Sequence, residues 1–151
     1  MVTAHLALFT PSEAATLVGG RRVIHAHDLV RMVEWPDEAD AQKKWMTRTP
    51  KAPALLRAWL ESLDEERCFE VFRCVTARAA VPDRDRCDIS IQLDALKDAR
   101  GQVGGPDFIC AASTCFTTLK LPAYETPQQL ERGMATLLAQ SKTAAGAFSD
   151  R

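Results

Sequence analysis

The chain has 151 residues, which is enough for one domain with a substantial core. Its apolar share of 46% and its charged share of 26% are ordinary for a globular protein, and they exclude disordered, collagen-like and coiled-coil classes. The 19 basic and 20 acidic residues nearly cancel, so we expect neither a nucleic-acid partner nor a membrane partner.

Two short helices are predicted before residue 36. Thr10 begins the first as its N-cap, and the pair Gly19 and Gly20 ends it. The second helix follows His27 or Asp28, because an acidic residue near a helix start is favourable for the helix dipole. The apolar residues of this second helix are Leu29, Val30 and Val33.

Residues 36–50 have the composition of a linker. Prolines stand at both ends, and the charge changes from acidic in residues 37–40 to basic in residues 43–48. Few apolar residues recur there, so this stretch has little to bury against a core. We therefore place a domain boundary at residues 36–50.

The region after the linker begins with two helices. Apolar residues recur over 54–63 at the i, i+3, i+4 and i+7 spacing of an amphipathic helix. Asp64 then caps a second helix, whose apolar face is supplied by Phe69, Val71, Phe72 and Val75. The short connection between the two predicts a helical hairpin.

Strands and a last helix follow. Residues 87–93 alternate strictly between apolar and polar, as a half-buried strand does, and residues 115–121 offer a second strand. Thr126 caps the final helix, with Pro127 at its first position. Helices first, then strands, then a helix is the order of an α+β domain with a small sheet.

The five cysteines are predicted to be free thiols. Their odd number, and the lack of a recognisable secretory signal, argue against a disulfide framework and favour the cytosol or the nucleus. No Cys-x-x-Cys pair occurs, and no spacing supports a zinc site. We expect no metal and no cofactor.

The segment with the clearest chemical meaning is residues 114–124, Thr-Cys-Phe-Thr-Thr-Leu-Lys-Leu-Pro-Ala-Tyr. It resembles the catalytic-cysteine segment of the HECT ubiquitin ligases, in which a Thr-Cys-Phe triplet leads through Leu-x-Leu-Pro-x-Tyr into a helix. The resemblance implies that Cys115, flanked by Thr114 and Phe116, accepts ubiquitin as a thioester from a ubiquitin-conjugating enzyme. It also implies that the ubiquitin then passes to a lysine of a protein substrate.

The resemblance covers most of the chain. Residues 72–82 look like the Phe-Val-Thr-Gly segment of the family and the proline that follows it, and Phe148 is the fourth residue from the C-terminus, where the family keeps a phenylalanine needed for transfer. On this interpretation residues 1–35 are the end of an N-lobe, 36–50 a hinge and 51–151 a C-lobe-like catalytic domain. Most of the N-lobe, with its docking surface for the conjugating enzyme, is then absent, which predicts that the chain is a fragment. Asp150 and the terminal carboxylate are candidates for orienting the proton of the attacking lysine, and Asp107 is a weaker one.

Two departures from the family keep other interpretations open. Ser113 stands where the family has histidine, and Ala77 stands where it has glycine. One alternative is a non-catalytic lobe that binds ubiquitin or regulates a ligase. A weaker alternative is a redox-sensing protein that uses Cys110 and Cys115. No histidine lies near Cys115 in the sequence, which argues against a Cys-His protease, although His25 or His27 is free to approach in space.

Overall fold

The computed structural model describes residues 10, 20, 23–36, 51–81, 89–93 and 109–146. Helices and strands alternate irregularly along these residues, as expected for a mixed α and β domain. Their order is α3 (Ala26–Arg31), β1 (Val33–Glu34), α5 (Ala52–Glu61), α6 (Glu65–Thr76), β2 (Ile89–Gln92), β3 (Ala111–Ser113), the 3-10 helix η1 (Thr114–Phe116), β4 (Thr118–Lys120) and α7 (Pro127–Gly146). None of the helices in these ranges has the length and apolar character needed to cross a membrane.

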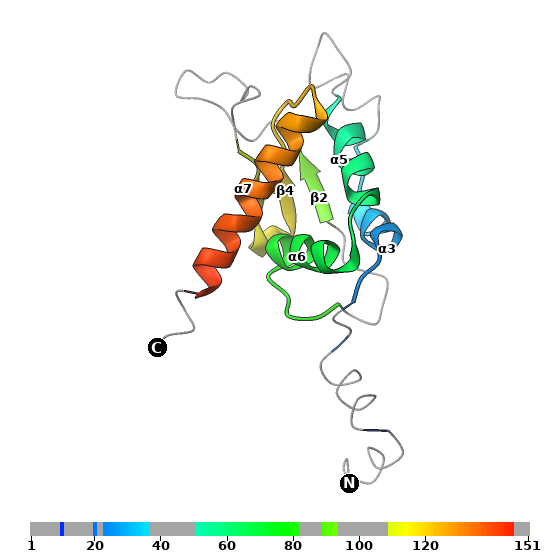
Figure 1. Ribbon diagram of the computed structural model, residues 1–151, viewed down its shortest axis with the longest axis vertical. Helices are drawn as coiled ribbons and strands as arrows, with labels where there is room; N and C mark the ends of the chain where they lie inside the picture. Colours follow the sequence, from blue (N-terminus) through cyan, green and yellow to red (C-terminus); the bar gives the residue numbers. More distant parts are fainter. Residues whose placement is uncertain are drawn as a thin grey trace.

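A small mixed sheet forms one layer, with the strand order β1-β2-β4-β3 (Figure 1). Strand β2 pairs in parallel with β1 on one side and with β4 on the other. Strands β3 and β4 are antiparallel, and Ser113 lies opposite Thr118 in their register. The turn between these two strands therefore carries the Thr-Cys-Phe triplet.

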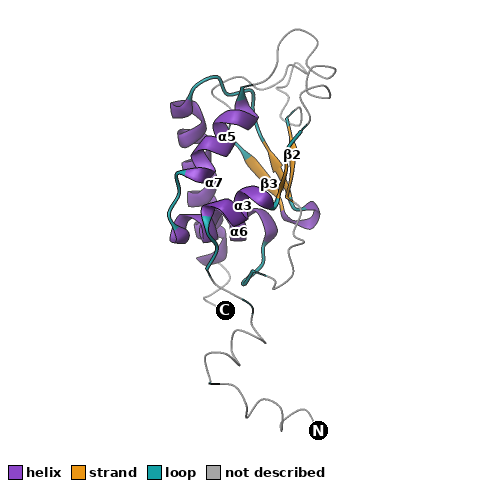
Figure 2. Cartoon of the chain, turned by 90° about the vertical axis from the view of Figure 1, so that its right-hand side faces the viewer, coloured by secondary structure: helices purple, strands orange, loops and turns teal. Residues whose placement is uncertain are grey.

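The α-helices of the described part gather on one face of the sheet (Figure 2). Helix α6 contacts β3 and β4, and α3 contacts β1, whereas α5 and α7 pack mainly against other helices. Each helix thereby buries one apolar stripe, as the 3.6-residue periodicity predicts. The most deeply buried side chains of this core are Leu29, Leu56, Phe72, Val75, Ile89, Leu121, Leu130 and Met134, each at most 2% exposed. The helices thus cover one face of the sheet, while the β3–β4 turn lies at the surface.

The described part of the N-terminal region belongs to this same core. Helix α3 contacts α5 and α6, and β1 joins the sheet through β2. Val33 was expected in the helix but lies in β1, because the Ile89 N–H donates to the Met32 carbonyl at 2.7 Å and draws this segment into the sheet. Residues 11–19 of the first predicted helix and residues 37–50 lie outside the described residues, so that helix and the domain boundary stay predictions.

The caps predicted for the later helices are confirmed. The Asp64 carboxylate accepts a hydrogen bond from the Arg67 backbone N–H at 2.8 Å. Helices α5 and α6 follow one another directly, but they lie crosswise in Figure 1 and each packs against α3 and α7, so they are not the side-by-side helical hairpin that was expected. At the start of α7 the Gln129 N–H donates to the Thr126 hydroxyl at 3.3 Å, while the Thr126 N–H donates to the Gln129 side chain at 3.1 Å. This reciprocal pair is a capping box, which satisfies two otherwise unpaired backbone donors.

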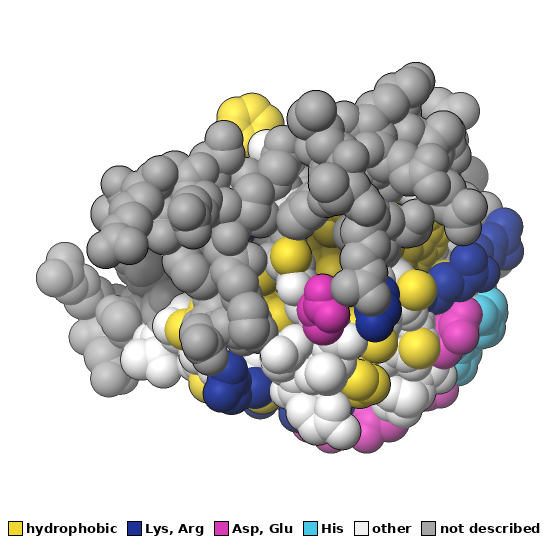
Figure 3. All heavy atoms as spheres, turned by 90° about the horizontal axis from the view of Figure 1, so that it is seen from above, with side chains coloured by type: hydrophobic (Ala, Val, Ile, Leu, Met, Phe, Trp, Pro, Cys, Tyr) yellow, Lys and Arg dark blue, Asp and Glu magenta, His cyan; other side chains and the backbone are white. Residues whose placement is uncertain are grey.

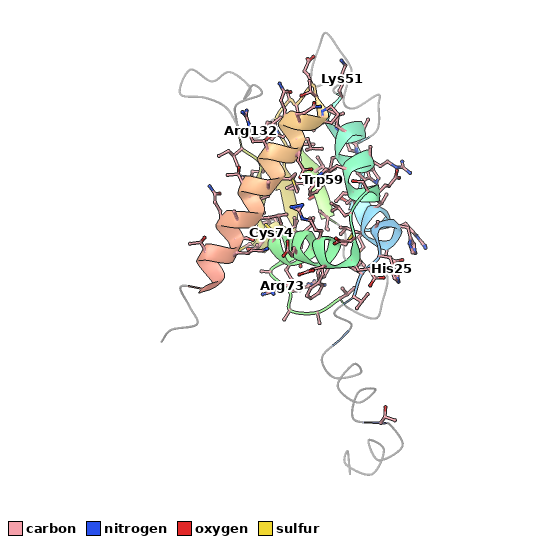
Figure 4. The ribbon with its side chains drawn as sticks, in the orientation of Figure 1. His25, Lys51, Trp59, Arg73, Cys74 and Arg132 are labelled. Carbon is pink, nitrogen blue, oxygen red and sulfur yellow. The ribbon has the colours of Figure 1, made fainter. Side chains whose placement is uncertain are left out.

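Helix α7 is also joined to α5 and to α6 by polar contacts at its surface. The Trp59 indole N–H on α5 donates to the Glu131 carboxylate on α7, and Arg67 lies 3.8 Å from the same carboxylate. Figure 4 shows Trp59 on the side of α5 that turns towards α7. Lys142 pairs with Glu70 at 2.6 Å further along the helix.

Ala77 ends α6 in a left-handed conformation, with φ of 54° and ψ of 18°. An L-residue other than glycine adopts this conformation only at a cost, whereas glycine adopts it freely. We therefore expect Ala77→Gly to raise the free energy of unfolding by about 0.5–1 kcal/mol after the larger chain entropy of glycine is subtracted. Thermal unfolding followed by circular dichroism measures this change.

Ala79 provides the matched control for this substitution. It is exposed like Ala77, but its backbone has no positive φ. Ala79→Gly should lower the stability slightly, since only the entropic cost of glycine remains. A fall in melting temperature of the same size for Ala77→Gly would contradict the prediction.

Candidate functional site

Cys115 lies in η1, at the turn that joins β3 to β4. The prediction of a strand over 115–121 is wrong for its first residues, since β4 begins at Thr118. The reason is Thr117, whose φ of 46° and ψ of 45° reverse the chain between the two strands. The Thr117 N–H donates to the Thr114 carbonyl at 3.4 Å and closes the turn around Cys115.

The triplet projects from the domain surface. Thr114, Cys115 and Phe116 are all exposed, and the Phe116 ring is 76% exposed. Within the described part of the chain, the Cys115 thiol has neither a hydrogen bond nor an ion pair. The sulfur is therefore sterically open to a macromolecular reactant, with an apolar ring beside it.

The other described cysteines are buried. Burial raises the pKa of the Cys110 thiol to about 11, although a contact of 3.5 Å with the Tyr124 hydroxyl partly offsets this effect. Burial also raises the pKa of Cys68 and of Cys74. Both belong to α6, and Figure 4 labels Cys74 there. A raised pKa disfavours the thiolate, which is the reactive form. Of the four cysteines with a described position, only Cys115 presents its sulfur to a reactant, and Cys87 lies outside the described residues.

Strand β2 anchors the turn from outside. The Ser90 N–H donates to the Thr117 carbonyl at 3.0 Å, and the hydroxyls of Ser90 and Thr118 are 3.0 Å apart. The Thr118 hydroxyl donates to the Phe116 carbonyl, also at 3.0 Å. Sequence analysis missed both hydroxyls, because a parallel pairing of β2 with β4 leaves no local signal.

Two further residues of the motif region, Ser113 and Tyr124, have described positions. Ser113 is half-buried in β3, immediately before the triplet. Tyr124 is 1% exposed, and burial raises the pKa of its phenol above the usual range, as does its hydrogen bond with Cys110. Tyr124 is therefore a neutral residue of the buried core. Phe148 and Asp150 lie outside the described residues, so their predicted roles stay predictions.

The two described histidines that sequence analysis considered are engaged elsewhere. His25 pairs with Glu65 through Nδ1 at 2.8 Å, and His27 pairs with Asp28 through Nε2 at 3.2 Å. Their rings stack with centroids 5.6 Å apart. Figure 3 shows the histidine side chains at the surface beside acidic and basic groups. The described residues form no cluster of three or more His, Cys, Asp or Glu side chains that could hold a metal ion.

Comparison with known proteins places this geometry in context. A family model described as HECT-domain (ubiquitin-transferase) matches residues 1–144. The match includes the Thr-Cys-Phe turn, both strands that flank it and strand β2, which anchors it. A comparison with curated proteins gives no match.

Proposed function

This chain belongs to the HECT family of ubiquitin transferases, and we propose that Cys115 is the residue on which it carries ubiquitin as a thioester. The family associates the chain with ubiquitin, ubiquitin-conjugating enzymes and protein substrates in general. The observation that carries the proposal is the position of Cys115 in the exposed Thr-Cys-Phe turn, whereas Cys68, Cys74 and Cys110 are buried.

The proposed reaction has two acyl-transfer steps. In the first, the Cys115 thiolate attacks the thioester carbonyl at the ubiquitin C-terminus, and the sulfur of the conjugating enzyme leaves as a thiolate. In the second, a neutral lysine amine attacks the new thioester, an isopeptide bond forms and the Cys115 thiolate is released. The proton lost by the amine is taken up by a base or by water. Because each leaving group is a thiolate, neither step requires a strong base at the sulfur.

The neighbours of Cys115 receive supporting roles in this proposal. Thr114 and Phe116 flank the sulfur, and the exposed Phe116 ring offers an apolar contact for the incoming acyl donor. We assign Asp150 to orienting the proton of the attacking lysine, and Phe148 to an apolar contact that favours transfer. The Phe148 assignment rests on the family resemblance, and the Asp150 assignment rests on the need of an attacking amine for a nearby carboxylate, since the two residues lie outside the described part.

The domain assignment follows the same resemblance. Residues 51–151 are proposed as the catalytic lobe, and residues 1–35 as the end of an N-lobe joined to it by residues 36–50. The packing of α3 against α5 and α6, and the pairing of β1 with β2, would then be the contact between these two parts. The family resemblance assigns the docking of a conjugating enzyme to the N-lobe surface.

A test of the first step should avoid any need for that docking surface. The chain of residues 1–151 is incubated with ubiquitin that carries a C-terminal alkyl thioester, which reacts by direct thiol exchange. We expect an adduct with the mass of one ubiquitin that disappears on treatment with dithiothreitol. Mass spectrometry and non-reducing gels measure it.

Two controls sharpen this experiment. Chain treated beforehand with N-ethylmaleimide should form no adduct, and adding free lysine to the purified adduct should release ubiquitin as a lysine conjugate. No labile adduct from the untreated, folded chain would contradict the proposal. Reversible ubiquitin binding in an NMR titration, without any adduct, would instead support the alternative of a non-catalytic binding lobe.

A further inference from the structure

The turn that carries Cys115 is strained and has few restraints of its own. Thr117 is β-branched, yet its φ of 46° lies in the left-handed region, where such residues are rare. The turn is only three residues long, its side chains are exposed, and its internal hydrogen bond is 3.4 Å long. A strained conformation persists only when the surrounding structure enforces it. The restraint on this turn must therefore come from outside it.

Strand β2 supplies that restraint through Ser90. Its backbone N–H donates to the Thr117 carbonyl at 3.0 Å, and its hydroxyl lies 3.0 Å from the Thr118 hydroxyl. The strand itself is firmly held, because Ile89 is 2% exposed and its N–H donates to the Met32 carbonyl at 2.7 Å. Ser90 thus connects the turn to β2, a strand in the interior of the sheet.

The hydrogen bonds of the two hydroxyls have a defined direction. The Thr118 hydroxyl has one proton, and it donates that proton to the Phe116 carbonyl at 3.0 Å. The Ser90 hydroxyl must then be the donor in its contact with Thr118. The result is a chain from Ser90 through Thr118 to the Phe116 carbonyl, in which each bond polarises the next. This series of hydrogen bonds ends at the Phe116 carbonyl, in the peptide unit one residue beyond Cys115.

We propose that Ser90 is a positioning residue for Cys115, acting through the Thr118 hydroxyl on the strained turn. This proposal rests on the proposed function, because the consequence of misplacing the sulfur is slower ubiquitin acceptance. Loss of the Ser90 hydroxyl leaves the Thr118 oxygen without its donor and weakens the hold on Phe116. The turn then samples conformations in which the sulfur is not aligned with the thioester carbonyl, and poor alignment slows a reaction even when the nucleophile is unchanged.

The test compares Ser90→Ala, Thr118→Val and their double variant in the full chain. The rate of adduct formation is measured in single turnover at saturating ubiquitin thioester, so that weaker binding does not contribute. We expect Ser90→Ala to slow the reaction about five-fold, as for loss of one hydrogen bond, and Thr118→Val, which removes two, to slow it at least as much. The double variant should be no slower than the slower single one, since both substitutions break the same chain.

Two further variants separate positioning from a general structural effect. Ser90→Thr keeps the hydroxyl and should restore the rate to within about two-fold of the wild-type chain. Gln92→Ala changes the exposed residue two positions along the same strand and should leave the rate unchanged. Heteronuclear NOE values of the Cys115 and Phe116 amides, measured without ubiquitin, should fall in Ser90→Ala but not in Ser90→Thr.

The outcomes distinguish this proposal from the function on which it rests. Wild-type rates and NOE values in Ser90→Ala would overturn the positioning role alone, as would failure of Ser90→Thr to restore the rate or multiplied losses in the double variant. Absence of an adduct from the wild-type chain would overturn the proposed function, and the positioning role with it.

Discussion

Replacing Cys115 by alanine should abolish the reductant-labile ubiquitin adduct of this chain. The expected loss in the rate of adduct formation is about three orders of magnitude or more, because the substitution removes the nucleophile itself. Cys115 is exposed and none of the residues of its turn belongs to the buried core, so the variant should fold normally. Adduct formation from a ubiquitin thioester, with and without dithiothreitol, measures the loss.

Cys110→Ala is the matched control for this prediction. The Cys110 sulfur is 2% exposed, and its pKa of about 11 leaves almost no thiolate at neutral pH. Its removal should leave the rate of adduct formation within about three-fold of the wild-type chain, the remaining change reflecting the lost contact with Tyr124. An adduct that persists in Cys115→Ala would refute the assignment. Cys87→Ala would then test the cysteine that lies outside the described residues.

Much of the helical structure was predictable because its determinants are local. The apolar spacing over 54–63 and the caps at Asp64 and Thr126 each depend on residues within one or two helical turns. The strand over 87–93 was predictable for the same reason, since alternation is visible within a few residues. Its described part, β2, has the expected position.

The strands that were missed depend on distant partners. β1 has two residues and β3 has three, which is too short for any periodicity to be visible. Val33 was assigned to a helix because its spacing from Leu29 and Val30 fits one, yet pairing with Ile89 decides its conformation. Parallel pairing of β2 with β1 and β4 joins residues far apart in the sequence, and no local pattern encodes it.

The candidate site divides in the same way. The Thr-Cys-Phe string identifies Cys115 by resemblance, but it does not predict that the triplet forms a turn. Thr117 shows why: threonine is unfavourable in the left-handed region, and its carbonyl is held there by the hydrogen bond that the Ser90 N–H of β2 donates. Those contacts follow from the sheet order, which sequence analysis did not reach.

Gly133→Ala should destabilise the domain by about 1–3 kcal/mol, which is the range typical of overpacking in a core. Gly133 lies inside α7, where alanine is normally the better helix former by about 1 kcal/mol. Here, however, an added Cβ would overlap the Tyr124 hydroxyl and lie 2.7 Å from the Tyr124 Cζ. Tyr124 is 1% exposed and cannot withdraw without displacing other core side chains, so the steric cost should exceed the gain in helix propensity.

Chemical denaturation of the single and double variants checks both the sign and the cause of this effect. Tyr124→Leu alone should be destabilising, because it leaves a cavity and removes the partner of the Cys110 sulfur. In that background the ring atoms that obstruct a Cβ at residue 133 are gone, so Gly133→Ala should become neutral or stabilising. Ala135→Gly, at an exposed position of α7, calibrates the propensity difference without a core contact. Equal costs of Gly133→Ala in the two backgrounds would show that the overlap with Tyr124 is not the cause.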